Sequence, residues 1–160
     1  MIKILIADDH RMFREGLKHI LAEYPDLVVA DEANNGQEVL DKIWKNNYDM
    51  VLLDITMPGM TGLEALKQLK NDKPKLPVLI LSMHPEEQYA VRVLRAGASG
   101  YLLKDSAYTE LAESIRIVAR GETYLPRKIT TLLVREFLQS DCPVNSRQTQ
   151  ATWRIVSVNT

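Results

Sequence analysis

Three aspartates follow short apolar segments of this chain, at places where buried strands would end. Asp8 and Asp9 come directly after residues 2–7, and Asp54 comes directly after residues 50–53. The carboxyl ends of parallel strands meet at one edge of an open α/β sheet, which is where such sheets bind ligands. We therefore expect the three carboxylates to share one site.

Two further polar residues close later apolar segments of the same kind. Ser82 follows residues 78–81, and Lys104 follows residues 100–103. In a parallel sheet with the strand order 2-1-3-4-5, the strand that leads to Asp54 lies between the strand of the acid pair and the strand of Ser82. All of these side chains are therefore expected in one pocket.

The charges of these residues indicate what the pocket can bind. Two carboxylates about 4 Å apart repel by about 4 kcal/mol at an effective dielectric constant of about 20, and one lysine cannot neutralise three acids. A hard divalent cation with oxygen ligands can, and Mg²⁺ suits a site with few protein carboxylates, water and phosphate oxygens. Beside such an ion an aspartate can attack phosphorus and form an acyl phosphate.

Each residue alone has a simpler interpretation. Asp8 and Asp9 before a helix can serve as a cap with a favourable dipole contact. Asp54 can be a turn former, Ser82 a loop hydroxyl and Lys104 a solvated charge. Their joint occurrence at strand ends in the correct order favours a functional site over these separate interpretations.

The segments between these residues alternate in their periodicity between strand and helix. This alternation predicts an α/β protein with a flavodoxin-like (βα)5 fold, a doubly wound parallel sheet of strand order 2-1-3-4-5. The strands are expected at residues 2–7, 27–31, 50–53, 78–82 and 99–103, and the helices at about 11–24, after Asn35, after Thr61, and at about 86–95 and 107–120.

Several local signals set the helix ends. Asn35 and Thr61 each precede a glutamate by three positions, as in a capping box. Pro25 is expected to stop the first helix, whose apolar face is predicted to carry Met12 and Leu17, together with Ile20 and Leu21.

Composition describes an ordinary protein without an excess of charge. The chain has 160 residues, a formal net charge of −1 and 46% hydrophobic residues, so no electrostatic argument favours nucleic-acid binding by the whole chain. The single cysteine, Cys142, excludes an internal disulfide and suits a reducing compartment. The sequence lacks a signal peptide and an apolar run of about 20 residues, so we expect a cytoplasmic protein without a membrane partner.

The acid pair, the lone aspartate, the hydroxyl and the lysine resemble, in this order, the receiver domain of two-component response regulators. Residues 82–89 and 97–105 are most similar to the NarL/FixJ class, whose members usually carry a LuxR-type helix-turn-helix behind the receiver. The resemblance implies that Asp54 accepts a phosphoryl group and that Ser82 and Lys104 hold its oxygens. It also implies that Tyr101 packs inward as a switch residue together with Ser82.

Mg²⁺ is the cofactor that the resemblance implies. Asp9 would bind it directly, Asp8 mainly through water, and Asp54 and the backbone carbonyl of Thr56 would complete the protein ligands. The implied phosphoryl donor is a sensor histidine kinase. Phosphorylation would change the surface of the fourth helix, fifth strand and fifth helix, and would favour a homodimer.

By the same resemblance the chain is a signalling switch rather than a conventional enzyme, and its output in a longer form would be transcription. One alternative is a stand-alone receiver that acts through protein partners or as a phosphate sink. Another is a haloacid-dehalogenase-like phosphatase, but that enzyme needs an aspartate two residues after the nucleophile, where this chain has Thr56.

The end of the chain differs in character from the rest. We divide the chain into a receiver at residues 1–121 and a second segment at 122–160, which begins with a linker helix at about 127–138. Residues 142–160 are polar and show no helix-turn-helix pattern. They are interpreted as a disordered tail, either native or from a truncated or out-of-frame end, so DNA binding would require a C-terminal domain missing here.

Three remaining residues lie near the expected pocket or share its chemistry. Met83 can either narrow solvent access to the pocket or serve in packing. His10 and His19 show no metal-ligand spacing and are assigned no role.

Overall fold

Five short apolar segments form one parallel sheet in a computed structural model of the chain, which describes residues 1–57, 59–83 and 87–139. The strand order is β2-β1-β3-β4-β5, as the sequence predicts for a flavodoxin-like fold. The strands are β1 (Ile2–Ala7), β2 (Leu27–Ala33), β3 (Met50–Asp54), β4 (Val78–Ser82) and β5 (Gly100–Leu103).

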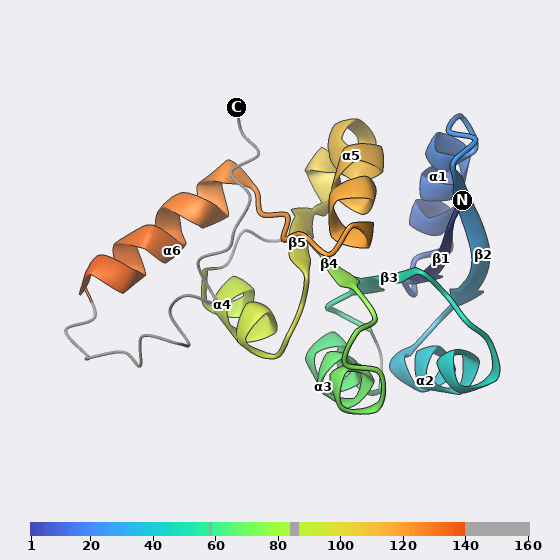
Figure 1. Ribbon diagram of the computed structural model, residues 1–160, viewed down its shortest axis with the longest axis horizontal. Helices are drawn as coiled ribbons and strands as arrows, with labels where there is room; N and C mark the ends of the chain where they lie inside the picture. Colours follow the sequence, from blue (N-terminus) through green and yellow to red (C-terminus); the bar gives the residue numbers. More distant parts are fainter. Residues whose placement is uncertain (58, 84–86, 140–160) are drawn as a thin grey trace.

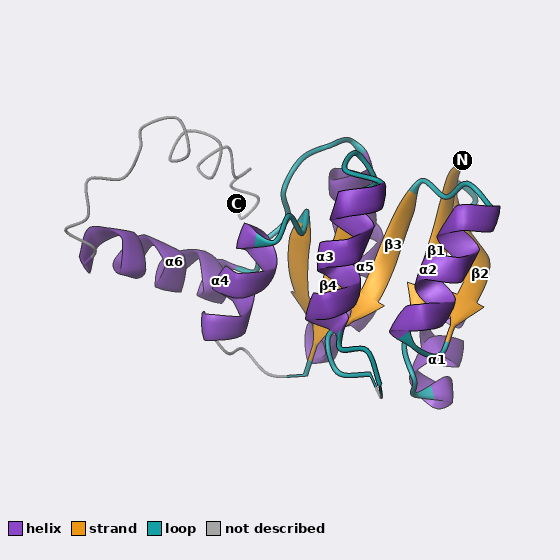
Figure 2. Cartoon of the chain, turned by 90° about the horizontal axis from the view of Figure 1, so that it is seen from below, coloured by secondary structure: helices purple, strands orange, loops and turns teal. Residues whose placement is uncertain are grey.

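Helices cover both faces of the sheet and give the molecule three layers. Figure 1 shows α1 and α5 on one face and α2, α3 and α4 on the other, and Figure 2 shows α2 and α3 in front of the strands. The helices are α1 (Arg11–Leu21), α2 (Gly36–Lys45), α3 (Gly62–Asp72), α4 (Glu87–Arg95), α5 (Ala107–Ala119) and α6 (Arg127–Gln139), and a 3-10 turn, η1 (Lys104–Ser106), precedes α5.

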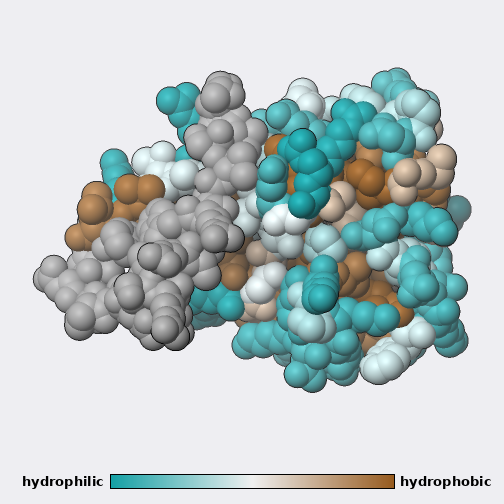
Figure 3. Space-filling model, in the orientation of Figure 1, coloured by the Kyte–Doolittle hydropathy of each residue, from teal (hydrophilic) through white to brown (hydrophobic). Residues whose placement is uncertain are grey.

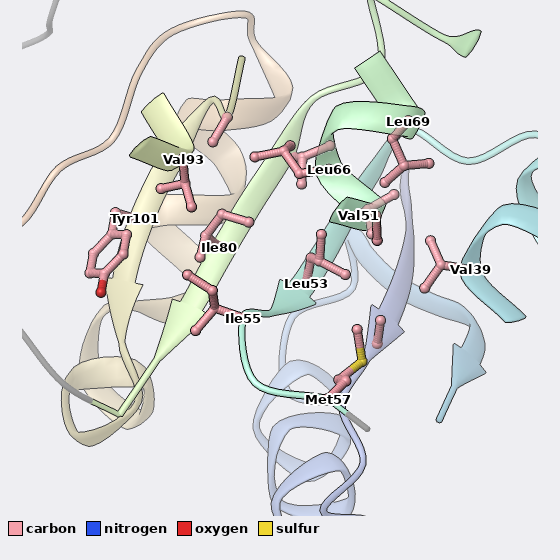
Figure 4. Close-up of a cluster of buried hydrophobic side chains, with 14 of the residues drawn as sticks. Val39, Val51, Leu53, Ile55, Met57, Leu66, Leu69, Ile80, Val93 and Tyr101 are labelled. Carbon is pink, nitrogen blue, oxygen red and sulfur yellow. The ribbon is translucent and has the colours of Figure 1, made fainter. Parts of the chain in front are cut away.

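The core consists of two apolar clusters, one on each side of the sheet. Every residue of β3 and β4 is buried, as expected for central strands that are covered on both faces. Figure 4 shows the cluster under α2, α3 and α4, where Val51 and Leu53 of β3 meet Leu66 and Leu69 of α3. Each fully buried side chain of this size contributes about 1.5–3 kcal/mol to stability.

Both predicted capping boxes contribute a side-chain cap. Asn35 Oδ1 accepts a hydrogen bond from the backbone N–H of Glu38 at 2.9 Å, and Thr61 Oγ1 accepts one from that of Glu64 at 3.2 Å. The helices α2 and α3 therefore begin where the sequence places them.

The structure corrects three details of the predicted elements. Met12 is 89% exposed, whereas Leu17 is fully buried, because five residues at 100° each place them on different sides of α1. The helix α1 ends at Leu21, and tighter turn bonds lead from there to Pro25. The strand β2 continues to Ala33, two residues beyond its predicted end.

The chain after α5 returns to the sheet. The backbone carbonyl of Tyr124 accepts a hydrogen bond from the backbone N–H of Tyr101 at 3.0 Å, and the backbone N–H of Tyr124 donates one to the carbonyl of Ser99 at 3.1 Å. Tyr124 and Ile129 are buried, and Ile129 belongs to the core cluster beneath α4. The division at residue 121 remains a prediction about domains, although residues beyond it contribute to the same core.

The helix α6 packs against α4 and extends away from the sheet (Figure 1). Val134 and Leu138 are 39% and 73% exposed, and Figure 3 shows apolar atoms on the surface of this helix. The interpretation of residues 142–160 as a tail, including Cys142, falls outside the described residues. Among the residues that the structure describes, no helix is long and apolar enough to cross a membrane.

Candidate functional site

The strand ends bring the predicted polar residues together at one edge of the sheet. Asp8 follows β1, Asp54 and Ser82 are the last residues of β3 and β4, and Lys104 follows β5. Asp8 and Asp54 are fully buried, and Ser82 and Lys104 are each 4% exposed. Four polar side chains are thus enclosed at the carboxyl edge of the sheet.

Lys104 is the centre of this arrangement. Its Nζ lies 2.8 Å from Asp8 Oδ2 and 3.3 Å from Asp54 Oδ2. The ring of Phe13 lies 4.6 Å from the same ammonium, an arrangement in which the ring face attracts the cation. The lysine therefore lies between the two buried carboxylates, and its ammonium also contacts Phe13 of α1.

Asp54 is held on its other oxygen by the loop that follows β3. Its Oδ1 accepts hydrogen bonds from the backbone N–H of Thr56 at 3.2 Å and from the Thr56 hydroxyl at 3.3 Å. Burial, and then repulsion from Asp8, raise the pKa of Asp54 to about 6, although Lys104 and the Thr56 amide lower it. The Asp54 carboxylate is therefore mostly ionised at neutral pH, and keeping it ionised in the folded protein lowers the free energy of unfolding.

This loop is shaped by two glycines. A Cβ at Gly62 would lie 2.5 Å from the Cα of Ile55 and 2.6 Å from the carbonyl oxygen of Asp54, so only glycine allows this close approach. Gly59 has a φ of +77°, which glycine adopts without strain. Pro58, which directly precedes Gly59, lies outside the described residues.

His10 also belongs to the cluster, although its sequence context predicts no role for it. Its backbone N–H donates to Asp8 Oδ1 at 2.7 Å, and its Nδ1 lies 3.2 Å from Asp8 Oδ1 and 3.3 Å from Asp9 Oδ1. The available signal was its position directly after the acid pair rather than any spacing from another histidine. Asp9 is more open, with 31% of its side chain accessible.

The donor set suits a hard cation. Asp8 Oδ2 and Asp54 Oδ2 are buried, and neither receives a hydrogen bond of normal geometry from the part of the chain that the structure describes. Single ligand atoms from Asp8, Asp9, His10 and Asp54 all lie within 4.8 Å of one another. Three carboxylates, two of them in contact with one ammonium, leave an excess of negative charge. Their oxygens are the ligands that Mg²⁺ prefers.

The residues expected to switch lie on neighbouring strands: Ser82 ends β4, and Tyr101 of β5 pairs with Ile80 of β4. Ser82 is nearly buried, and Tyr101 is fully buried. Figure 4 shows Tyr101 at one end of the apolar cluster, close to Val93 and Ile80. Met83 is 61% exposed, so most of its side chain faces solvent.

Comparison with known proteins places the chain and its fold in one family. A family model described as response regulator receiver domain matches residues 4–116. The transcriptional regulatory protein DegU of Brevibacillus brevis is 42% identical over 136 residues, which are 85% of this chain and 58% of that protein. The oxygen regulatory protein NreC of Staphylococcus carnosus is 38% identical over 157 residues, 98% of this chain and 72% of NreC.

A solved structure agrees with both sequence matches. The crystal structure of a LuxR-family two-component response regulator from Aurantimonas sp. SI85-9A1 superimposes with a TM-score of 0.82 at 29% identity, covering 87% of this chain and 99% of that one. This chain spans only 58% of DegU. On the family model, the relatives and the fold together, the chain belongs to the response regulator receiver family.

Proposed function

We propose that the chain is a phosphorylation-controlled switch that takes a phosphoryl group from a sensor histidine kinase onto Asp54. The observation that carries this proposal is the buried Asp54 carboxylate, which has Lys104 3.3 Å from one oxygen and Thr56 on the other. Burying one acid beside a second lowers the stability of the protein, so stability does not explain why Asp54 is buried here. Such an arrangement is typical of a reactive group.

In the transfer, an oxygen of the Asp54 carboxylate attacks phosphorus while the phosphorus–nitrogen bond to the donor imidazole breaks. The electron pair of that bond stays on the imidazole nitrogen, and an acyl phosphate forms. The Thr56 amide and hydroxyl hold the carboxylate in one orientation through Oδ1. Lys104 offers a compact ammonium with three donors, which suits the oxygens of the transferred group.

Asp9, Asp8, Asp54 and the backbone carbonyl of Thr56 are the proposed protein ligands of Mg²⁺. When bound, this ion offsets the negative charge that the carboxylates and the phosphoryl oxygens share. The buried oxygens Asp8 Oδ2 and Asp54 Oδ2 support this assignment, because they face Lys104 but receive no hydrogen bond of normal geometry from the described residues. His10 lies close enough to Asp8 and Asp9 to orient the acid pair.

The proposed output is a change in the surface formed by α4, β5 and α5, through movement of Ser82 and Tyr101. Tyr101 supports this proposal because it is buried in β5 within the cluster that also contains Val93 of α4. The match to the transcriptional regulatory protein DegU supports transcription as the output of a longer form. A stand-alone receiver that acts through partners or as a phosphate sink is the alternative.

The phosphatase alternative is less well supported. A phosphatase of the haloacid dehalogenase type needs a general acid two residues after its nucleophile. Thr56 holds that position, and its hydroxyl donates to Asp54 rather than offering an acid. The receiver assignment therefore accounts better for the site.

Phosphorylation of Asp54 can be tested directly. The protein is incubated with acetyl phosphate and Mg²⁺, and the phosphoryl group is located by mass spectrometry. We expect modification of the wild-type protein and of Asp41→Asn, a control at an exposed aspartate of α2, and none of Asp54→Asn. Modification of Asp54→Asn to the wild-type extent would contradict the assignment.

A further inference from the structure

Arg14 is a buried cation that the proposed chemistry does not use. It lies on α1 and is only 9% exposed. Its Nη1 donates to the backbone carbonyl of Asp8 and to Asn34 Oδ1, both at 2.5 Å, and its Nε donates to Glu32 Oε1 at 3.1 Å. A long charged side chain is rarely buried without a specific set of partners, and here the partners come from three segments.

The first of these partners connects Arg14 with the functional site. The carbonyl that Arg14 holds belongs to Asp8, whose carboxylate contacts Lys104. The backbone N–H of Asp8 donates to the carbonyl of Ala33 at 3.1 Å, and its Oδ1 accepts from His10. Asp8 is therefore fixed by hydrogen bonds at its backbone amide, its backbone carbonyl and its side chain. Arg14 supplies the hydrogen bond to the carbonyl.

The remaining partners anchor the guanidinium to β2 and to the start of α2. Glu32 also binds Lys18 at 2.9 Å. The backbone N–H of Asn34 donates to Glu38 Oε2 in the first turn of α2 at 2.5 Å. Arg14 thus joins the loop after β1 to the neighbouring strand, and only a planar fork of donors can reach all three acceptors at once.

We propose that Arg14 is a positioning residue for cation binding at the acid pair. By holding the Asp8 carbonyl, it fixes the direction of the chain from Asp8 to Asp9 and so presents both carboxylates to a divalent ion. This inference rests on the proposed function, in which the acid pair holds Mg²⁺. Outer partners of metal ligands typically change metal affinity by about 10–100-fold when they are removed.

The test compares Mg²⁺ affinity with stability in the same set of variants. Isothermal titration calorimetry with MgCl2 gives the dissociation constant, and thermal melts in EDTA give the stability of the metal-free protein. We expect Arg14→Met to bind Mg²⁺ about 10–100-fold more weakly, and Arg14→Lys to keep the charge without restoring the affinity. Lys18→Met, the matched control, removes another cation from Glu32 but does not contact Asp8, so its affinity should stay at the wild-type value.

A purely structural role gives a different result. Arg14→Met would then melt at a lower temperature in EDTA and bind Mg²⁺ within about twofold of wild type, which would overturn the proposal. If Arg14→Met does not fold, Asn34→Ala and Arg14→Lys carry the test, and wild-type affinity in both would overturn it too. If the wild-type protein itself fails to bind Mg²⁺, the proposed function fails with the inference, and that outcome is distinct from equal binding by all variants.

Discussion

At the scale of single residues, one ammonium organises the site. Lys104 contacts two fully buried carboxylates and the ring of Phe13. Removing one partner from a buried ionic cluster leaves the remaining charges uncompensated, which costs about 3–5 kcal/mol. The stability of the metal-free protein should therefore depend strongly on this lysine.

Replacing this lysine tests that dependence. We expect Lys104→Met to lower the free energy of unfolding by about 3–5 kcal/mol in EDTA at neutral pH, as measured by urea denaturation. Lys67→Met, at an exposed position of α3, is the control and should change stability by less than about 0.5 kcal/mol. A loss in Lys104→Met no larger than the loss in the control would show that the acids do not depend on this charge.

The raised pKa of Asp54 predicts an unusual pH dependence. Burial raises it from 3.8 to about 6, so between about pH 4 and pH 6 the folded state holds more protons than the unfolded state, and stability falls as pH rises. The full difference corresponds to about 3 kcal/mol, since one pKa unit is about 1.4 kcal/mol.

Asp54→Asn removes this titration. In EDTA we expect the variant to be about 1–3 kcal/mol more stable than wild type above about pH 7 and nearly equal to it at about pH 4. Urea denaturation across this range measures the difference, and Asp41→Asn serves as the control. A constant difference between Asp54→Asn and wild type at all pH values would contradict the raised pKa.

The sequence predicted most of the site residues because they end apolar strands. Asp8, Asp54 and Lys104 meet through sheet topology, which the order of the strands already determines. His10 was missed although its position directly after the acid pair was a signal, whereas Arg14 was missed for a physical reason. The contacts of Arg14 with Asn34 and Glu32 depend on how α1 packs beside β2, and local sequence does not encode that packing distance.

At the scale of elements, the loop after β3 illustrates how a glycine controls a site. At Gly62 an added Cβ would meet the backbone of Asp54 and Ile55 below 3.0 Å. Neither chain segment can move without shifting the end of β3. The position of the Asp54 carboxylate therefore depends on the absence of a side chain at Gly62, eight residues later.

A pair of glycine variants separates this effect from helix propensity. Gly62→Ala is expected to lower the free energy of unfolding by about 1–3 kcal/mol through overpacking. At Gly16, inside α1, a Cβ would lie 3.6 Å from the Tyr108 hydroxyl, so Gly16→Ala should stabilise the protein by about 0.5–1 kcal/mol. Chemical denaturation of both variants checks the two signs, and stabilisation by Gly62→Ala would refute the close approach.

Elements with mixed polarity were harder to predict than apolar ones. The strand β2 was predicted to end at Asp31 but continues through Glu32 to Ala33. In the folded protein Asp31 pairs with Lys42 and Glu32 with Lys18, so partners from the helices allow charged residues to remain in the strand. The sequence shows the charges but not these partners.

At the scale of the whole molecule, the proposed switch needs a defined amount of free energy. To convert a ratio of inactive to active protein of 99:1 into 1:99, the phosphoryl contacts must favour the active state by about 5.5 kcal/mol. Hydrogen bonds to charged groups contribute about 1.5–3 kcal/mol each. Two to four such bonds from Ser82, Lys104 and backbone amides would be sufficient.

We therefore expect beryllofluoride with Mg²⁺ to shift the wild-type protein toward a homodimer. Lys104→Ala should still accept a phosphoryl group but fail to shift, because it lacks one of the contacts that favour the active state. Analytical ultracentrifugation of both proteins, with and without the mimic, measures the change, and Lys67→Ala is the control. Equal dimerisation of Lys104→Ala and wild type would show that Lys104 does not connect the site to the surface.

The return of Tyr124 to the sheet also affects how the molecule avoids aggregation. The outer side of β5 would otherwise present unpaired amide and carbonyl groups, and an open strand edge can pair with another chain. Tyr124 bonds to Ser99 and Tyr101 along this side, while charged residues occupy the opposite edge at β2. A fragment cut at residue 121 would expose one of these edges, and self-association through added strands is the expected consequence.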